Sequence, residues 1–115
     1  MKTMILLSLL LTGCLNNDEG ETSSGGQIVE TEIAGAYQLA SQHYDFSSIR
    51  RIYFTDTDGA WMRYMYDGFI KVNRTYFEQY TIEQNACALV HELAHHNGAD
   101  QAEAFKVQDE CMEII

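Results

Sequence analysis

Residues 81–98 read TIEQNACALVHELAHHNG, and this stretch predicts a single amphipathic helix with a defined start and end. Thr81 followed three residues later by Gln84 is a capping box, so the helix is expected to begin at Ile82. It should end just before Gly98, which can supply a left-handed cap. Apolar residues at helical spacing form its core-facing stripe, namely Ile82, Ala86, Leu89, Val90 and Leu93.

The same helix carries the motif His91-Glu92-Leu93-Ala94-His95, or H-E-x-x-H. Residues four apart lie on one helix face, so His91 and His95 can hold one metal ion together. Glu92 lies close enough to polarise a water on that metal, which is the arrangement that a zinc-dependent hydrolase needs. The alternative is a coincidental pair of surface or core histidines. It is disfavoured because three of the four histidines fall within residues 91–96.

The rest of the chain predicts one small α+β domain over residues 28–115. Asp67-Gly68 is a hairpin signal, and a second turn is expected over 56–59. These turns would join three strands into an antiparallel meander. Asp100 with Glu103 forms another capping box, which would open a C-terminal helix. The remaining predicted elements are an N-terminal helix over 30–43 and strands over 49–55, 61–66 and 69–73.

The order helix, sheet, H-E-x-x-H helix and further helix resembles the zincin metallopeptidases, particularly their smallest single-domain members. The resemblance spans roughly residues 37–112. It implies that His91 and His95 bind Zn²⁺. It also implies that Glu92 is the general base, which takes a proton from the zinc-bound water and later passes it to the leaving amine. The implied substrate is a peptide or protein, paired with the edge of strand 69–73 or of its neighbour.

The third protein ligand is less clearly indicated. Residues 91–98 also match H-E-x-x-H-x-x-G, the opening of the metzincin pattern, which places its third ligand at Gln101. Glutamine is a poor zinc ligand, so the chain departs from that pattern. Asp100 resembles the aspartate of aspartate-type zincins, and Glu103 resembles the glutamate of glutamate-type zincins. Glu103 and then Asp100 are therefore the predicted third ligands, unless both serve only the helix cap.

Other polar groups could complete such a site. His96 faces away from the histidine pair and is expected to act as an outer partner or to meet solvent. A zincin also needs a group that stabilises the developing oxyanion, usually a tyrosine or histidine from another segment. The candidates here are Tyr66, Tyr76 and Tyr80, each with a place in the core as the alternative.

The N-terminus has the features of an export signal. Lys2 is followed by an apolar run over 4–11, and Leu11-Thr12-Gly13-Cys14 resembles the bacterial lipobox. The resemblance implies a signal peptide over 1–13, cleaved before a lipidated Cys14 that anchors the chain to a membrane. Residues 14–27 are polar and rich in Gly and Ser, which predicts a flexible tether. Leu15 after the cysteine favours the periplasmic face of the outer membrane.

Lipidation of Cys14 would leave Cys87 and Cys111 as the remaining cysteines of an exported domain. An oxidising compartment and even parity favour a disulfide between them. If their helices pack antiparallel, the bridge would join the metal-bearing helix to its neighbour. The alternatives are two buried thiols, or Cys87 as a metal ligand.

The formal net charge of −10, with no basic patch, argues against a nucleic-acid partner.

The motif and the export signal together give the first hypothesis, a lipid-anchored zinc metallopeptidase of the cell envelope. The alternative is a non-catalytic envelope lipoprotein that binds a partner protein and uses zinc as a structural staple. A zinc site closed by four side chains, with no position for water, would favour the alternative.

Overall fold

The structure is a computed structural model that describes residues 21–24, 27–56 and 59–115. The predicted signal over 1–13 and Cys14 lie outside the described residues. The chain forms a mixed α+β domain, as the sequence predicts. In chain order its elements are β1 (Glu21–Ser24), β2 (Gln27–Glu30), a 3-10 turn (Thr31–Ile33), α1 (Ala34–Ser41), β3 (Arg51–Thr55), β4 (Met62–Tyr64), β5 (Phe69–Asn73), α2 (Arg74–Phe77), α3 (Ile82–His96) and α4 (Gln101–Ile114).

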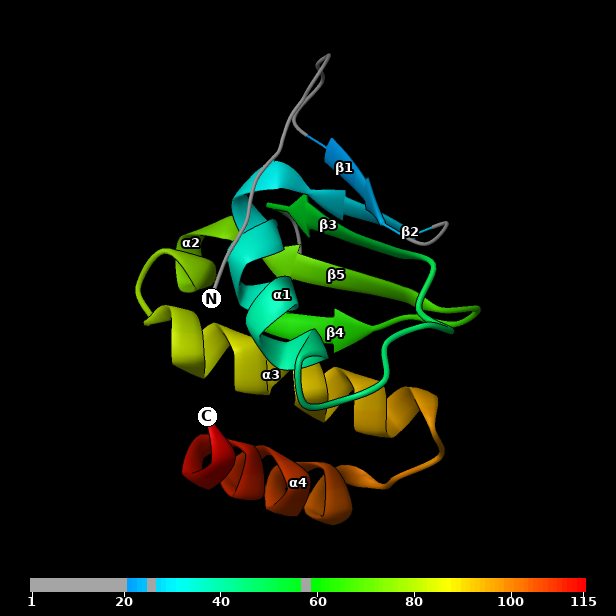
Figure 1. The fold of residues 1–115 in the computed structure, drawn as a ribbon, viewed down its shortest axis with the longest axis vertical. Helices are drawn as coiled ribbons and strands as arrows, with labels where there is room; N and C mark the ends of the chain where they lie inside the picture. Colours follow the sequence, from blue (N-terminus) through cyan, green and yellow to red (C-terminus); the bar gives the residue numbers. More distant parts are fainter. Residues whose placement is uncertain (1–20, 25–26, 57–58) are drawn as a thin grey trace.

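The strands form one mixed sheet in the order β1-β2-β3-β5-β4 (Figure 1). β2 pairs with β3 and β3 pairs with β5 in parallel, whereas β1 with β2 and β4 with β5 are antiparallel. β4 is therefore an edge strand. β1 falls within residues 14–27, the range predicted as a tether, so the sheet extends into that range.

The predicted three-stranded antiparallel meander is wrong, although its three strands form close to where they were expected. The hairpin from β4 to β5 is present, and its turn residues Asp67 and Gly68 have positive φ angles of 63° and 82°. However, β5 rather than β4 lies beside β3. Burial explains this order, because β5 buries Ile70 and Val72 completely while β4 buries only Met62. The turn expected over 56–59 includes residues 57–58, which lie outside the described residues.

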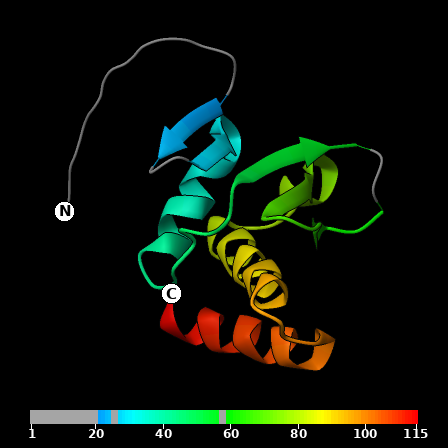
Figure 2. The ribbon, with the colours of Figure 1, turned by 90° about the vertical axis from the view of Figure 1, so that its right-hand side faces the viewer.

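α1 and α3 cover one face of the sheet, and α4 packs against α3 on the side away from the sheet (Figures 1 and 2). α1 begins later than predicted because the 3-10 turn precedes it. The core lies between the two helices and the sheet. Its largest fully buried apolar side chains are Phe46, Ile33, Ile49, Ile52, Ile70, Leu89, Val29, Val72 and Val90.

Both ends of α3 are formed by the residues that predict them. Thr81 Oγ1 accepts a hydrogen bond from the Gln84 N–H at 3.1 Å, and Gln84 Oε1 accepts one from the Thr81 N–H at 2.9 Å. At the other end Gly98 has φ 101°, and the Ala99 N–H donates to the Ala94 carbonyl at 2.9 Å. This bond is typical of a Schellman cap, and it turns the chain sharply toward α4.

A buried amide joins the start of α3 to the segment before β4. Asn85 is fully buried, and its Oδ1 accepts a hydrogen bond from Trp61 Nε1 at 2.9 Å. Its Nδ2 donates to the Phe77 carbonyl at 2.9 Å. Because buried polar groups require partners, Asn85 fixes the position of α3 relative to the edge of the sheet.

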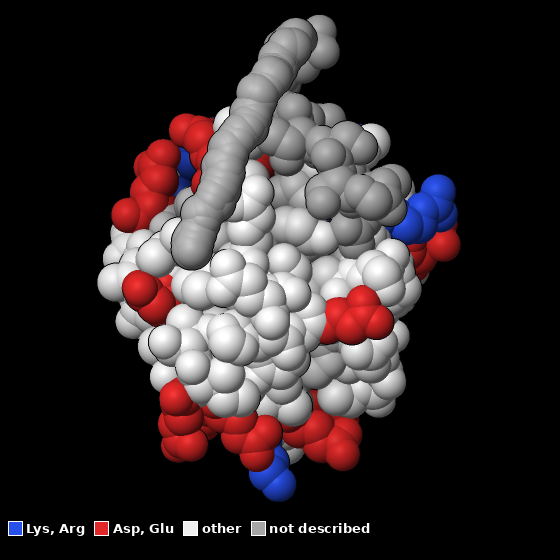
Figure 3. All heavy atoms as spheres, viewed as in Figure 1, with Lys and Arg blue, Asp and Glu red and all other residues white. Residues whose placement is uncertain are grey.

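Acidic side chains gather over α4 on the face shown in Figure 3. The exposed acidic residues of that helix are Glu103, Asp109, Glu110 and Glu113. Such a surface fits the acidic composition of the chain. Among the described residues, no helix has the length and apolar character needed to cross a membrane.

Candidate metal and catalytic site

His91 and His95 lie one turn apart on α3, with their side chains on the same face. Their Nε2 atoms are 3.2 Å apart, and their rings meet edge to face with centroids 4.9 Å apart. His91 is buried and His95 is half-buried. The structure therefore brings the two predicted zinc ligands together, with one nitrogen of each ring directed to a shared point.

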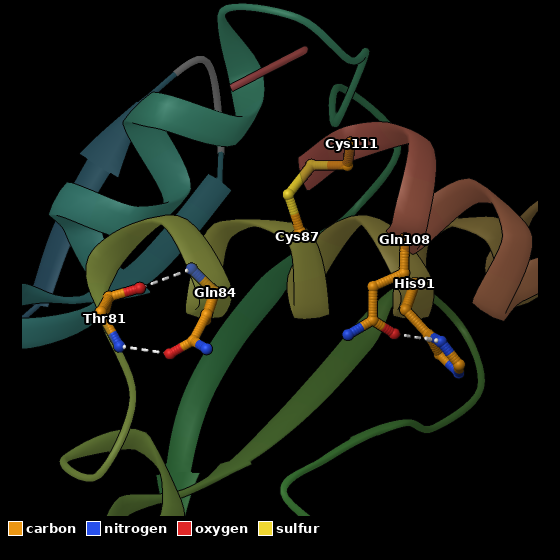
Figure 4. The surroundings of a disulfide bond; sticks show 6 residues. All are labelled: Thr81, Gln84, Cys87, His91, Gln108 and Cys111. Atoms are coloured by element: carbon orange, nitrogen blue, oxygen red, sulfur yellow. Dashed lines mark hydrogen bonds between the residues drawn. A yellow bond between two sulfur atoms is a disulfide. The ribbon is translucent and has the colours of Figure 1, made fainter. Parts of the chain in front are cut away.

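The other nitrogen of each imidazole is bonded to a neighbouring segment. His91 Nδ1 lies 2.8 Å from Gln108 Oε1 on α4 (Figure 4). His95 Nδ1 lies 3.0 Å from the carbonyl oxygen of Ala99, in the Schellman turn after α3. The Ala99 carbonyl can only accept, so a neutral His95 carries its proton on Nδ1, and a neutral His91 does the same when the amide oxygen of Gln108 faces it. Each Nε2 then directs a lone pair at the shared point, which is the state that a metal requires.

Glu92 is buried beside this pair and is bonded to the edge of the sheet. Its Oε1 accepts a hydrogen bond of 2.7 Å from the backbone N–H of Tyr64 in β4. Its Oε2 lies 3.9 Å from His91 Nε2. Burial raises the pKa of the Glu92 carboxyl above its ordinary value, and the Tyr64 N–H opposes that rise. One carboxylate oxygen is thus held in place while the other faces the histidines.

The site lies at the wall of a cleft of about 540 Å³ between α3 and the edge strand. Its lining includes the H-E-x-x-H side chains, together with Met62 and Tyr64 of β4. A smaller cavity of about 170 Å³ shares His91 and Glu92 with the cleft. The apolar lining of this smaller cavity consists of Trp61, Met62, Ala88 and Phe105.

The predicted third ligands do not lie beside the histidine pair. Asp100 Oδ1 accepts from the Glu103 N–H at 2.9 Å, and Glu103 Oε1 accepts from the Asp100 N–H at 3.2 Å. The two carboxylates thus close the capping box at the start of α4. Glu103 also lines a different cavity, of about 520 Å³, together with Tyr44, Val90 and Val107. Both side chains therefore cap the helix, which is the alternative role that the sequence predicts for them.

Gln101, at the position where the metzincin pattern has its third ligand, lies beside the histidine pair instead. Its Oε1 is 3.0 Å from His91 Nε2 and 2.7 Å from His95 Nε2. In the described part of the chain, no three His, Cys, Asp or Glu side chains are grouped so that they could hold a metal ion. This finding is consistent with the His91–His95 site because its third converging group is an amide. The two imidazole nitrogens suit zinc, and the amide oxygen is a weaker donor than the carboxylate that the sequence predicts.

Cys87 and Cys111 form the predicted disulfide, which joins α3 to α4. The bridge therefore excludes both alternatives, free thiols and a Cys87 metal ligand. Cys87 lies one helical turn before His91 and on the same side of α3, facing α4 (Figure 4). The bridge thus holds α4 close to the histidine pair, in the place from which Gln108 reaches His91.

None of the tyrosines proposed for the oxyanion lines the cleft. Tyr66 is 78% exposed, Tyr76 lies on α2, and the ring of Tyr80 stacks on Trp61. Tyr64, which sequence reasoning missed, lines the cleft instead. Its hydroxyl lies 2.9 Å from Nδ1 of His96. The alternation of residues 61–66 could have placed Tyr64 on the strand, but only the strand order places it beside Glu92.

His96 lies away from the histidine pair and is bonded to neighbouring segments. In addition to the Tyr64 hydroxyl, it contacts Ser48, whose Oγ lies 2.9 Å from His96 Nε2. His96 therefore connects the end of α3 to β4 and to the loop before β3. It does not point toward the shared point of His91 and His95.

The chain matches no protein-family model, and it matches neither a curated protein nor a solved structure. The functional argument consequently depends on the geometry of the site.

Proposed function

We propose that this protein is a zinc-dependent peptidase that uses Glu92 as its general base. The observation that carries the proposal is the convergence of His91 Nε2 and His95 Nε2 within 3.2 Å, beside a buried carboxylate and an open cleft. The Ala99 carbonyl behind His95 and the Gln108 amide oxygen behind His91 favour the tautomer that leaves each Nε2 available to a metal. A coincidental histidine pair would not need this combination of features.

Under this proposal His91 and His95 would hold the zinc ion. When bound, zinc lowers the pKa of a coordinated water to about 7 and polarises the carbonyl of the substrate. The hydrogen bonds from Nδ1 of the two rings to Gln108 Oε1 and the Ala99 carbonyl fix the ring orientations. They also make both Nε2 atoms stronger donors.

Glu92 would transfer a proton from the attacking water to the leaving amine. Its Oε1 stays on the Tyr64 N–H, so Oε2 is the atom that would accept a proton from the attacking water. Burial favours the protonated carboxyl, which makes the group a competent acid for the second transfer, to the leaving amine nitrogen. The bond to Tyr64 keeps the carboxylate oriented during both transfers.

The substrate would lie along β4. Two backbone bonds, Asn73 N–H to Trp61 C=O and Met65 N–H to Phe69 C=O, set the pairing of β4 with β5. In an antiparallel pair the outward groups alternate with the paired ones, so the backbone groups of Met62 and Tyr64 point away from β5. The Tyr64 N–H is held by Glu92 Oε1, so an extended peptide would pair with the remaining outward groups of β4, those of Met62 and the Tyr64 carbonyl. The 170 Å³ cavity would receive an apolar side chain of that peptide.

The alternative, a structural zinc site in a partner-binding lipoprotein, requires side chains that close the site. Asp100 and Glu103 bond to each other's backbone, and Cys87 is in a disulfide. These contacts favour the enzyme over the structural site.

We propose in addition that the protein is exported and anchored through a lipidated Cys14. The Cys87–Cys111 disulfide supports an oxidising compartment. Under this proposal a Cys14→Ser chain leaves the membrane fraction, and its continued sedimentation with membranes would contradict the anchor.

The test of the activity is Glu92→Gln in the disulfide-bonded chain. We expect zinc to remain bound and hydrolysis of a labelled unfolded protein to fall at least about 100-fold, because general-base catalysis contributes about 10²–10⁴-fold. Glu83→Gln, an exposed change in the first turn of the same helix, is the matched control and should cleave normally. Undiminished hydrolysis by the Glu92→Gln protein would contradict the mechanism.

A further inference from the structure

We infer that Gln101 is the third protein ligand of the metal, through its side-chain oxygen. The inference deepens the proposed function and rests on its assignment of His91 and His95 as zinc ligands. It replaces both carboxylates suggested by the sequence with a neutral amide.

The hydrogen bonds around the site show that the converging atoms are acceptors. The Ala99 carbonyl can only accept, so His95 must carry its proton on Nδ1 and a lone pair on Nε2. Gln108 has the same effect on His91 when its amide oxygen, rather than its NH₂ group, faces Nδ1. Gln101 Oε1 is itself an acceptor, and it lies within 3.0 Å of both Nε2 atoms.

Three acceptor atoms so close together repel one another unless a positive charge lies between them. A metal ion supplies that charge, and the amide oxygen of Gln101, although a weaker zinc ligand than a carboxylate, is the third donor directed at the shared point. The rival explanation is that the Gln101 amide is turned by 180°, so that its NH₂ group donates to both rings without any metal. Amide oxygen and nitrogen are distinguished only by their hydrogen bonds, so metal binding decides between the two explanations.

The position of Gln101 in α4 is set by groups outside the site. The Asp100–Glu103 capping box fixes where α4 begins, and Gln101 is the first residue of the helix. The Schellman turn at Gly98 brings that first residue back over the end of α3. Either carboxylate could reach the metal only after leaving its bond in the cap, whereas Gln101 needs no such change.

The first experiment measures zinc affinity by competition with a colorimetric chelator, using the full disulfide-bonded chain. We expect Gln101→Ala to weaken binding by about 100-fold or more, since loss of an outer partner alone costs about 10–100-fold. The controls Asp100→Asn and Glu103→Gln remove one carboxylate each but keep side chains that can cap the helix. Both should bind zinc like the parent chain.

The second experiment introduces a ligand with its own spectrum. In the Gln101→Cys protein loaded with Co²⁺, we expect a near-ultraviolet thiolate-to-cobalt charge-transfer band, because a soft thiolate at this position would coordinate the ion. Glu103→Cys is the matched control, and it should give no such band. The band therefore reports whether position 101 reaches the metal, independently of any catalysis.

The possible results separate this inference from the proposed function. The inference is overturned if Gln101→Ala keeps full zinc affinity while His91→Ala loses it, or if the charge-transfer band forms only with Glu103→Cys. A parent chain that binds no zinc overturns both the inference and the peptidase. A chain that binds zinc through Gln101 but cleaves no peptide overturns the peptidase alone.

Discussion

At the scale of single residues, the site depends on the groups that hold each functional side chain as much as on the H-E-x-x-H motif. Each histidine has an acceptor behind it, and Glu92 has a backbone N–H from β4. None of these partners belongs to the motif, and two of them lie after it in the chain. The motif suggests the proposed chemistry, while residues from β4, from the turn after α3 and from α4 orient its side chains.

A substitution at Gln108 tests how much the acceptor behind His91 contributes to zinc affinity. Gln108→Ala removes the acceptor behind His91 Nδ1, and we expect zinc affinity to fall by about 10–100-fold, the usual loss when an outer partner is removed. Asp109→Asn, at the next and exposed position of α4, should leave affinity unchanged. Equal zinc affinities for the Gln108→Ala protein and the parent chain would show that the ring of His91 needs no support from α4.

The sequence predicts single residues well where the signal is local. The capping boxes, the Gly98 cap and the positions of His91 and His95 depend on neighbours within a few residues, and all were found as expected. The sequence did not identify Gln101 as the third converging group, because carboxylates are better zinc ligands than amides. The helix cap binds the carboxylates of Asp100 and Glu103, and Gln101 is therefore the side chain that faces the histidines.

At the scale of elements, the strands could be predicted but their pairing could not. Alternation and turn residues locate β3, β4 and β5, but two strands that follow each other in the chain need not be neighbours in the sheet. β5 lies between β3 and β4, and its buried Ile70 and Val72 belong to the core between the sheet and the helices. This order matters for function, because it leaves β4 at the edge, where Tyr64 reaches Glu92.

A substitution at Gly68 tests whether the hairpin turn that positions β4 requires a glycine. Gly68 has φ 82°, and a Cβ there would lie 2.9 Å from the Ser48 carbonyl oxygen. We expect Gly68→Ala to lower the free energy of unfolding by about 1–3 kcal/mol, measured by denaturant titration. Gly59→Ala is the matched control, because a Cβ there meets no atom within 4 Å. A Gly68→Ala protein as stable as the Gly59→Ala protein would contradict the strained turn.

At the scale of the whole molecule, α4 contributes much to the candidate site and little to the core. It packs on α3, away from the sheet, and it buries only Ala104 and Cys111. Yet it carries Gln108, behind one histidine, and Gln101, which we assign to the metal. A helix with so little buried surface is poorly held by the hydrophobic effect alone. The covalent bridge to α3 therefore has a functional as well as a structural consequence.

We expect loss of the disulfide to lower both the stability of the chain and its zinc affinity. Replacing Cys87 and Cys111 together with alanine opens a loop of sequence separation 24, and the chain-entropy model gives a loss of about 3 kcal/mol in the free energy of unfolding. Zinc affinity should fall as well, because α4 would no longer be held against His91. Saturating zinc should restore part of the lost stability, since a ligand that binds only the folded chain stabilises it. Measurements of unfolding and of zinc affinity on the same protein check both effects. If stability falls but zinc affinity does not, the disulfide is not what holds Gln108 behind His91, and Gln101 keeps its place through the capping box and the Schellman turn.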